Sequence, residues 1–248
     1  MQSTLVKHNK FFKAGHATSF DTAKRYAVSC DKDSNEYGRI NSPGLITTGD
    51  FSLVMSFRYN HTDPVSVAPF QITEGLRGQI LRGGKMRILF ADGTSSTYMD
   101  TNNNVIDEEW HTIVISCDRD GDMDYYEDYD GLGSGYTESV DISSVTGSLE
   151  LAGIDDNWYF GHDGSTRYSG IDIDQIAFYD SVLSIGSSVV IYTALQAGVE
   201  ISTPISLPDP ICYWKCNEGT GTTVANAGSE SLAMTLYNTP TWITDGMI

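Results

Sequence analysis

The stretch FSLVMSFRYN, residues 51–60, decides the fold of this chain. Its large apolar residues occupy every second position, with mostly polar residues between them: Phe51, Leu53, Met55, Phe57 and Tyr59. Because successive side chains of a β-strand point to opposite faces, this alternation predicts a strand with one buried face.

The same alternation recurs in YAVSC (26–30), KMRILFADG (85–93) and HTIVISCD (111–118). Each stretch leads into Asp, Asn or Gly residues that are typical of turns. Many short strands joined by polar turns are typical of an all-β fold. We therefore predict an antiparallel β-sandwich, or jelly roll.

One short helix is predicted near residues 185–197. Ser184 can cap its first turn, and Gly198 can end it. The residues that helical spacing places on its buried face are Ile185, Val189, Tyr192 and Leu195.

The chain has 248 residues and a formal net charge of -18. An acidic surface repels phosphate backbones, so nucleic acid is not an expected partner. No stretch is long and apolar enough to span a bilayer, and residues 1–20 lack the apolar segment of a secretory signal. We therefore expect no membrane partner and synthesis in the cytosol.

The chain is predicted to have four parts. Residues 1–20 form a basic arm that contains no Asp or Glu and carries Lys7, Lys10 and Lys13. Residues 21–200 form the jelly-roll body, and residues 201–210 form a Pro-rich connector. Residues 211–248 are too few to bury a core of their own, so they are expected to complete the same sandwich.

The stretch DRDGDMDYYEDYDG, residues 118–131, is dense in carboxylates. An EF-hand is excluded, because Met123 and Tyr129 stand where that loop needs Gly and Glu. We interpret DRDG as the tight turn of a β-hairpin with solvated acids. Calcium is the one cofactor kept open, since hard oxygen ligands occur at close spacing in Asp120, Asp122 and Asp124.

An enzyme is not expected, and no catalytic residue is assigned. Carboxylate catalysis needs two acids at a fixed separation, one of them with a raised pKa. The stretch GIDIDQIAFYD places Asp172 and Asp174 on one face of a strand, but Ile176 comes next and the stretch holds no Glu. It therefore departs from the Glu-x-Asp-x-x-Glu strand of sandwich-fold glucanases, which remain the least favoured alternative.

The order of these motifs resembles that of the laminin-G-like, concanavalin-A-like jelly-roll superfamily. The resemblance is carried by FSLVMSFRYN, by EEWHTIVISCDRDGD (108–122) and by WYFGHDGSTRYSGIDIDQIAFYDSVLS (158–184). The tail from Tyr213 to Gly246 looks like the opening of such a domain, although here it comes last. A circular permutation is therefore predicted, with a second copy cut short as the alternative.

The resemblance and the chain's composition together suggest a non-enzymatic virion protein of a tailed phage, made in the host cytoplasm. In this hypothesis it is a head decoration, cement or head-fibre protein. The basic arm would hold it on the major capsid protein or a tail protein, and the acidic sandwich would face outward. A homo-oligomer is also expected, since symmetric partners protect the edges of a sandwich.

The alternative is a lectin-like, carbohydrate-binding module that recognises a cell-surface glycan. Aromatic residues that could stack on a sugar lie around the polar loop GHDGSTRYSG: Trp158, Tyr159 and Tyr168. Asp163 and Arg167 could hydrogen-bond to sugar hydroxyls. Against this, strand alternation buries one residue of each neighbouring pair, so Tyr159 or Phe160 can equally be core.

Overall fold

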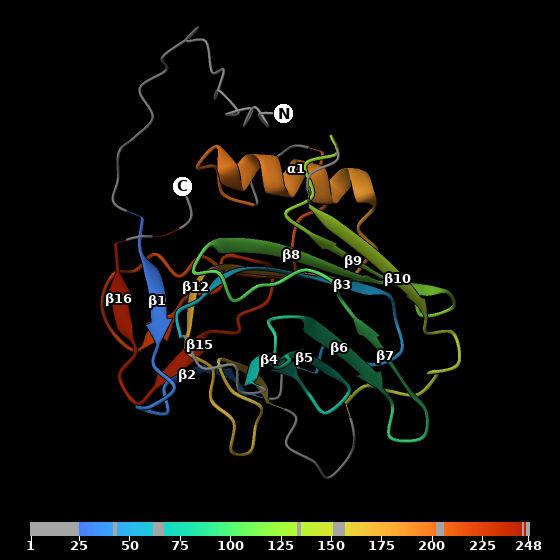
Figure 1. The fold of residues 1–248 in the computed structure, drawn as a ribbon, viewed down its shortest axis with the longest axis horizontal. Coiled ribbons are helices and arrows are strands. Elements are labelled where there is room, and N and C mark those ends of the chain that lie inside the picture. The colour runs from blue at the N-terminus through green and yellow to red at the C-terminus, as the bar shows by residue number, and fades with distance from the viewer. Residues whose placement is uncertain are drawn as a thin grey trace, which may run out of the picture.

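The computed structural model describes residues 25–41, 44–61, 67–132, 135–150, 157–201, 206–244 and 246. Two antiparallel sheets face each other, and one helix lies across the outer side of one of them (Figure 1). The predicted antiparallel sandwich with one short helix is confirmed.

The first sheet, sheet A, has eight strands. Along it run β10 (Tyr136–Asp141), β9 (Asp122–Glu127), β8 (Trp110–Cys117), β3 (Phe51–Tyr59), β12 (Ile171–Tyr179), β1 (Ala27–Cys30) and β16 (Thr241–Ile243). Strand β13 (Cys212–Trp214) pairs with β12 as well, beyond the end of β1.

The second sheet, sheet B, also has eight strands. In order they are β14 (Thr223–Val224), β15 (Met234–Tyr237), β2 (Tyr37–Ile40), β11 (Trp158–Phe160), β4 (Val67–Ile72), β5 (Leu76–Ile80), β6 (Met86–Ala91) and β7 (Ser96–Asp100).

The main core lies between the two sheets, as the alternation predicts. The five alternating apolar residues of FSLVMSFRYN are in it, and none of these five is more than 2% exposed. The alternating residues Met86, Ile88 and Phe90 of sheet B belong to the same core. All four cysteines are buried and free, with Cys30 and Cys117 on strands of sheet A.

The helix α1 (Ile185–Gln196) begins at Ser184, whose hydroxyl accepts a hydrogen bond from the backbone N–H of Ser187 at 3.2 Å. Its predicted buried face is wrong in part, because Ile185 is 47% exposed. The residues that are buried are Ser188, Ile191 and Leu195. Ser188 is tolerated on the buried face because its hydroxyl donates a hydrogen bond to the backbone carbonyl of Ile185 at 2.7 Å.

The helix packs on the outer face of sheet A. Ile191 and Leu195 form a second apolar cluster with Val54, Val114 and Tyr213 from three strands of that sheet. This covering explains why strand β3 is buried on both faces, although its sequence alternates. None of the described helices has the length and apolar character needed to cross a membrane.

The C-terminal strands pair with the rest of the chain in both sheets. In sheet A, β16 pairs with β1, and Figure 1 shows these two strands side by side in red and blue. In sheet B, β15 pairs with β2. A circularly permuted origin of this arrangement stays a prediction.

The acidic stretch forms the predicted hairpin turn between β8 and β9. The backbone N–H of Gly121 donates to the carbonyl of Asp118 at 3.0 Å, and the side chain of Asp118 accepts from the N–H of Asp120 at 3.1 Å. The turn is therefore held by its own first aspartate.

Candidate functional site

The loop that was predicted to hold a sugar connects β11 of sheet B with β12 of sheet A. Trp158, at its start, points into the main core, where its ring lies 4.9 Å from that of Phe178 in an edge-to-face contact. Because Trp158 is 0% exposed, the prediction that it stacks on a sugar is wrong. Alternation along β11 sends Trp158 and Phe160 inward and leaves Tyr159 on the outer face.

The side chain of Asp163 stabilises the conformation of this loop. Its Oδ1 accepts hydrogen bonds from the backbone N–H groups of Ser165, Thr166 and Arg167 at 2.9–3.0 Å, and the residue is 6% exposed. Burial raises the pKa of Asp163, but these hydrogen bonds outweigh burial and hold the pKa below its usual range. The side chain of Arg167 is half exposed, with its Nε 3.8 Å from Oδ2 of Asp163.

A cluster of aromatic rings lies on the outer face of sheet B beside this loop. We call it the tyrosine cluster, and its members are Tyr37, Tyr159, His162, Tyr168 and Tyr237. The ring centroid of His162 lies 4.2 Å from that of Tyr168 and 4.8 Å from that of Tyr37, and Tyr37 stacks on Tyr237 at 4.9 Å. Tyr159 is 4% exposed, whereas Tyr37, Tyr168 and Tyr237 are half-buried.

Sequence reasoning found Tyr159 and Tyr168 but missed Tyr37, His162 and Tyr237. Tyr37 and Tyr237 are directly opposite each other on β2 and β15, which lie far apart in the sequence. Only a prediction that these two strands are neighbours could have found the pair.

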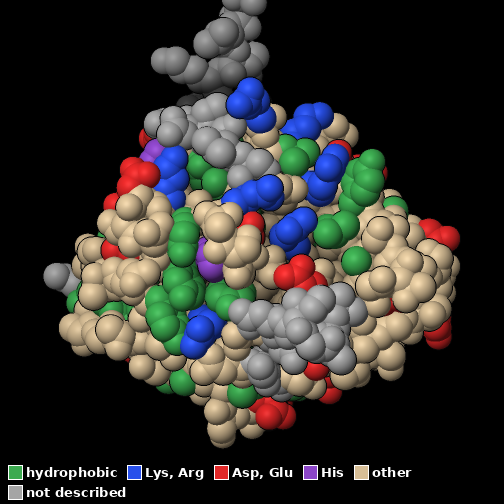
Figure 2. Space-filling model, turned by 90° about the horizontal axis from the view of Figure 1, so that it is seen from below, with side chains coloured by type: hydrophobic (Ala, Val, Ile, Leu, Met, Phe, Trp, Pro, Cys, Tyr) green, Lys and Arg blue, Asp and Glu red, His purple; other side chains and the backbone are tan. Residues whose placement is uncertain are grey.

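A row of mostly polar side chains continues from the cluster across the same face. The residues opposite one another on successive strands form a single row from β15 to β7: Thr235, Arg39, Tyr159, Gln71, Arg77, Leu89 and Tyr98. The guanidinium carbon of Arg39 lies 4.5 Å from the ring centroid of Tyr237, and its Nη2 donates to the Tyr237 hydroxyl. Figure 2 views the molecule from this side and shows Lys and Arg side chains beside hydrophobic ones and a histidine.

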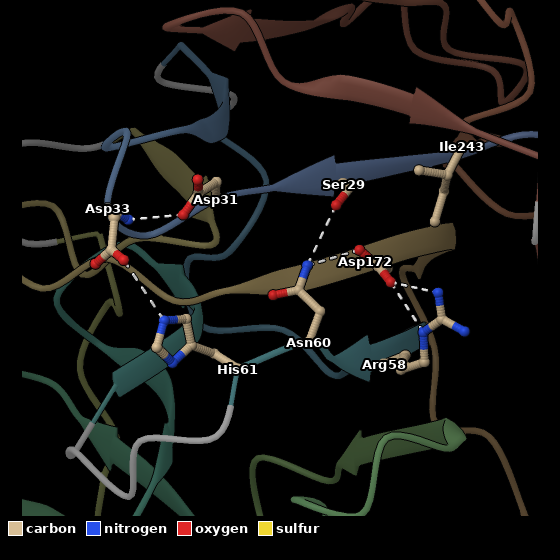
Figure 3. Close-up of a pocket in the computed structure, with 8 residues that line it drawn as sticks. All are labelled: Ser29, Asp31, Asp33, Arg58, Asn60, His61, Asp172 and Ile243. Carbon is tan, nitrogen blue, oxygen red and sulfur yellow. Dashed lines mark hydrogen bonds and ion pairs between the residues drawn. The ribbon is translucent and has the colours of Figure 1, made fainter.

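A separate hollow lies over β1, β3 and β12 of sheet A (Figure 3). It has a volume of about 570 Å³ and is lined by Ser29, Asp31, Asp33, Arg58, Asn60, His61, Asp172 and Ile243. Asp172 accepts hydrogen bonds from Arg58 at 2.6 and 2.9 Å and from the amide of Asn60 at 2.7 Å, so both of its oxygens are used. A register shift at Asp174 also interrupts the alternation that predicted a shared face for the two aspartates.

His111 lies in a buried ionic network at the end of the core. Its Nδ1 is 2.8 Å from Asp128 and its Nε2 is 3.0 Å from Asp107, while the carboxylate of Glu127 lies 3.6 Å from Nδ1. Burial lowers the pKa of His111, but the three carboxylates outweigh burial and raise the pKa to about 9. Glu127 is 0% exposed, and its carboxylate also accepts from Tyr125 at 2.6 Å.

In the described part of the chain, one group of three His, Cys, Asp or Glu residues has its ligand atoms within 4.8 Å of one another: His111, Glu127 and Asp128. Asp120, Asp122 and Asp124 are not brought together in this way. They lie on the hairpin turn and along β9, where the carboxylate of Asp124 accepts from the hydroxyl of Tyr126 at 3.2 Å. Calcium binding by these three aspartates stays a prediction.

The fold defines an antiparallel sandwich of the jelly-roll type that recurs in binding domains of solved proteins. The chain is similar to a protein from Bacteroides ovatus that is proposed to bind carbohydrate, with a TM-score of 0.64 and 11% identity over 89% of this chain. It is also similar to the binding domain of botulinum neurotoxin serotype G, with a TM-score of 0.52 and 14% identity over 74% of this chain. A third likeness is to the binding domain of Paraclostridial Mosquitocidal Protein 1, with a TM-score of 0.50 and 13% identity over 68% of this chain.

The matched region spans 60%, 44% and 45% of those three chains, respectively. No protein-family model matches the sequence, and no curated protein matches it. The likeness therefore establishes the fold alone.

Proposed function

We propose that this protein is a non-enzymatic, carbohydrate-binding module, and that the tyrosine cluster is its binding surface. The observation that carries the proposal is the set of half-buried rings of Tyr37, Tyr168 and Tyr237 on the outer face of sheet B, with the guanidinium group of Arg39 directly beside them. The apolar face of a sugar packs on aromatic rings, and its hydroxyls need nearby hydrogen-bonding groups. Arg39, which is half-buried, supplies such a group beside the ring of Tyr237.

The arrangement of the two sheets supports this choice of face. Helix α1 covers the outer face of sheet A, whereas no described helix covers the outer face of sheet B. Likeness in fold to the Bacteroides ovatus protein adds support for carbohydrate as the ligand. The hollow over sheet A is less suited, because it has no Trp, Tyr or Phe among its lining residues.

The proposal is tested first by screening the protein on a glycan array. The affinity for the best ligand is then measured by calorimetry for the wild-type protein and for the Tyr237→Ala variant. Loss of one stacking ring is expected to weaken binding about tenfold, which corresponds to about 1.4 kcal/mol. Tyr192→Ala is the matched control, because Tyr192 is half-buried like Tyr237 but lies on helix α1, over the outer face of sheet A. Absence of binding to every glycan, or equal losses in the two variants, would contradict the proposal.

The virion role remains a second prediction. Its anchoring residues, Lys7, Lys10 and Lys13, lie outside the described residues. None of the observations above favours a capsid or tail protein as the partner, and the homo-oligomer also stays a prediction. Deletion of residues 1–20 followed by a measurement of particle occupancy tests the arm, and unchanged incorporation would refute its role.

A further inference from the structure

We infer that the carbohydrate bound by the outer face of sheet B is acidic, and that Arg39 and Arg77 contact its carboxylate or sulfate groups. The inference rests on the proposed function and specifies the class of glycan. It starts from the register of the sheet, which places both arginines in one row with Tyr159 and Gln71 between them. Because neighbouring strands are about 4.8 Å apart, three strand spacings separate the two backbones by about 14 Å.

Some cations of this protein are paired with its own carboxylates, and others are not. The chain has 33 acidic residues and 15 Lys and Arg. Arg87 pairs with Asp100 at 2.5 Å, Arg58 with Asp172 at 2.6 Å and Lys215 with Glu200 at 2.7 Å.

Arg39 and Arg77, in contrast, have no carboxylate within 4.0 Å among the residues that the structure describes. The Nε atoms of both are buried and lack a hydrogen-bond partner in the same part of the chain. Both side chains are half-buried, so these guanidinium groups are partly removed from water without an internal anion to compensate them. An anion supplied by a ligand would compensate them.

The chemistry of the arginines suits a carboxylate or sulfate on a sugar. A guanidinium presents its N–H donors as a planar fork that matches two oxygens of one anion. Arg39 is held over the ring of Tyr237, so its donors stand beside the proposed stacking surface. The tyrosine cluster would take the apolar face of a sugar, and the arginines would take the charged groups on neighbouring units.

A nucleic acid is a poorer match to the same face. Its affinity depends on neutralising many phosphates, whereas this chain has a net charge of -18 that repels a long phosphate backbone. Two arginines separated by aromatic and amide groups fit an anionic sugar with few charges.

The test compares binding of the 248-residue chain to four carbohydrate probes and to a single-stranded oligonucleotide by calorimetry at 0.15 M salt. Hyaluronan oligosaccharide carries carboxylates alone, heparin oligosaccharide carries sulfates as well, and dextran and laminarin oligosaccharides are neutral. We expect at least one acidic probe to bind at least tenfold more tightly than both neutral probes. Hydrogen bonds to a charged group contribute about 1.5–3 kcal/mol, so Arg77→Gln should weaken that binding by about tenfold or more.

Two further variants keep the result interpretable. Lys215→Gln removes the same charge from the sheet A side, where Lys215 lies over the ring of Tyr213, and is expected to leave binding unchanged. Arg77→Lys keeps the charge but loses the planar fork, so it should bind more weakly than wild type. If the melting curve of Arg77→Gln shows that this variant does not fold, Arg77→Lys takes its place in the test.

Four outcomes would overturn the inference. Equal binding of neutral and acidic probes, unaffected by Arg77→Gln, would refute the acidic glycan while leaving the proposed function intact. Equal losses in Arg77→Gln and Lys215→Gln would show a general charge effect rather than a site. Tighter binding of a single-stranded oligonucleotide than of either acidic glycan would assign the face to another ligand. Binding to none of the four probes nor to any arrayed glycan would refute the proposed function, and the inference with it.

Discussion

Replacement of Trp214 by alanine tests whether the C-terminal strands are an integral part of the core. Trp214 is 0% exposed on β13, its ring lies 6.3 Å from that of Trp158, and its Nε1 donates to the backbone carbonyl of Leu232 at 2.7 Å. Truncation of a buried Trp to Ala costs about 3–5 kcal/mol. That is a large part of the 5–15 kcal/mol by which a typical domain is stable.

For a chain of this size, each kcal/mol lowers the melting temperature by about 2–4 °C, so a loss of about 4 kcal/mol predicts a decrease of about 8–16 °C. The assay is thermal unfolding followed by near-UV circular dichroism. Trp242→Ala is the matched control, because Trp242 is another tryptophan of the same C-terminal part, on the edge strand β16, and is only half-buried. We expect Trp242→Ala to lower the melting temperature by less than half as much as Trp214→Ala does. A Trp214→Ala melting temperature within about 2 °C of wild type would refute the assignment of the C-terminal strands to the core.

Three more predictions concern pH, packing and the helix. The pKa of His111 is about 9 in the folded protein and about 6.5 when unfolded, so the charged imidazole stabilises the fold fully below pH 6.5 and this contribution is lost as pH rises towards 9. In urea unfolding, the free energy of unfolding should decrease by about 2 kcal/mol between pH 6 and 8.5, and His111→Gln should abolish this decrease. An equal decrease in the wild type and the variant would contradict the prediction. Gly78→Ala should lower the free energy of unfolding, measured in urea, by about 1–3 kcal/mol, because the added Cβ would clash with the ring of Phe70. Gly49→Ala is the control and should leave the free energy of unfolding nearly unchanged, because its added Cβ meets no atom within 4 Å. Ser184→Ala should lower the stability by about 1 kcal/mol through loss of the helix cap, and an unchanged urea midpoint would exclude that role.

Features that depend on local chemistry were predicted well from the sequence. The inward side of FSLVMSFRYN follows from a period of two, and the start of α1 at Ser184 follows from the preference of serine for the cap position. The turn at Asp118 to Gly121 follows from turn propensities in the same way. In each case the deciding interactions lie within a few residues of one another.

The exposure of the binding residues was predicted less well, because it depends on which side of a strand faces the opposite sheet. Alternation puts Trp158 and Tyr159 on opposite faces, but it does not say which one is inside. Packing of the sheets buries Trp158 against Phe178 and leaves Tyr159 outside. Asp163, predicted to bind hydroxyls, uses its Oδ1 to hold its own loop.

The sequence by itself determined that this chain folds into two-faced strands with one helix, since side-chain alternation and capping are properties of short segments. Only the tertiary structure decided which strands are neighbours. It placed β15 beside β2, and so stacked Tyr237 on Tyr37, and it aligned Arg39 with Arg77 across four strands. The physical reason is that strand order is set by long-range burial over the whole core, and a binding surface built from several strands exists only once that order is fixed.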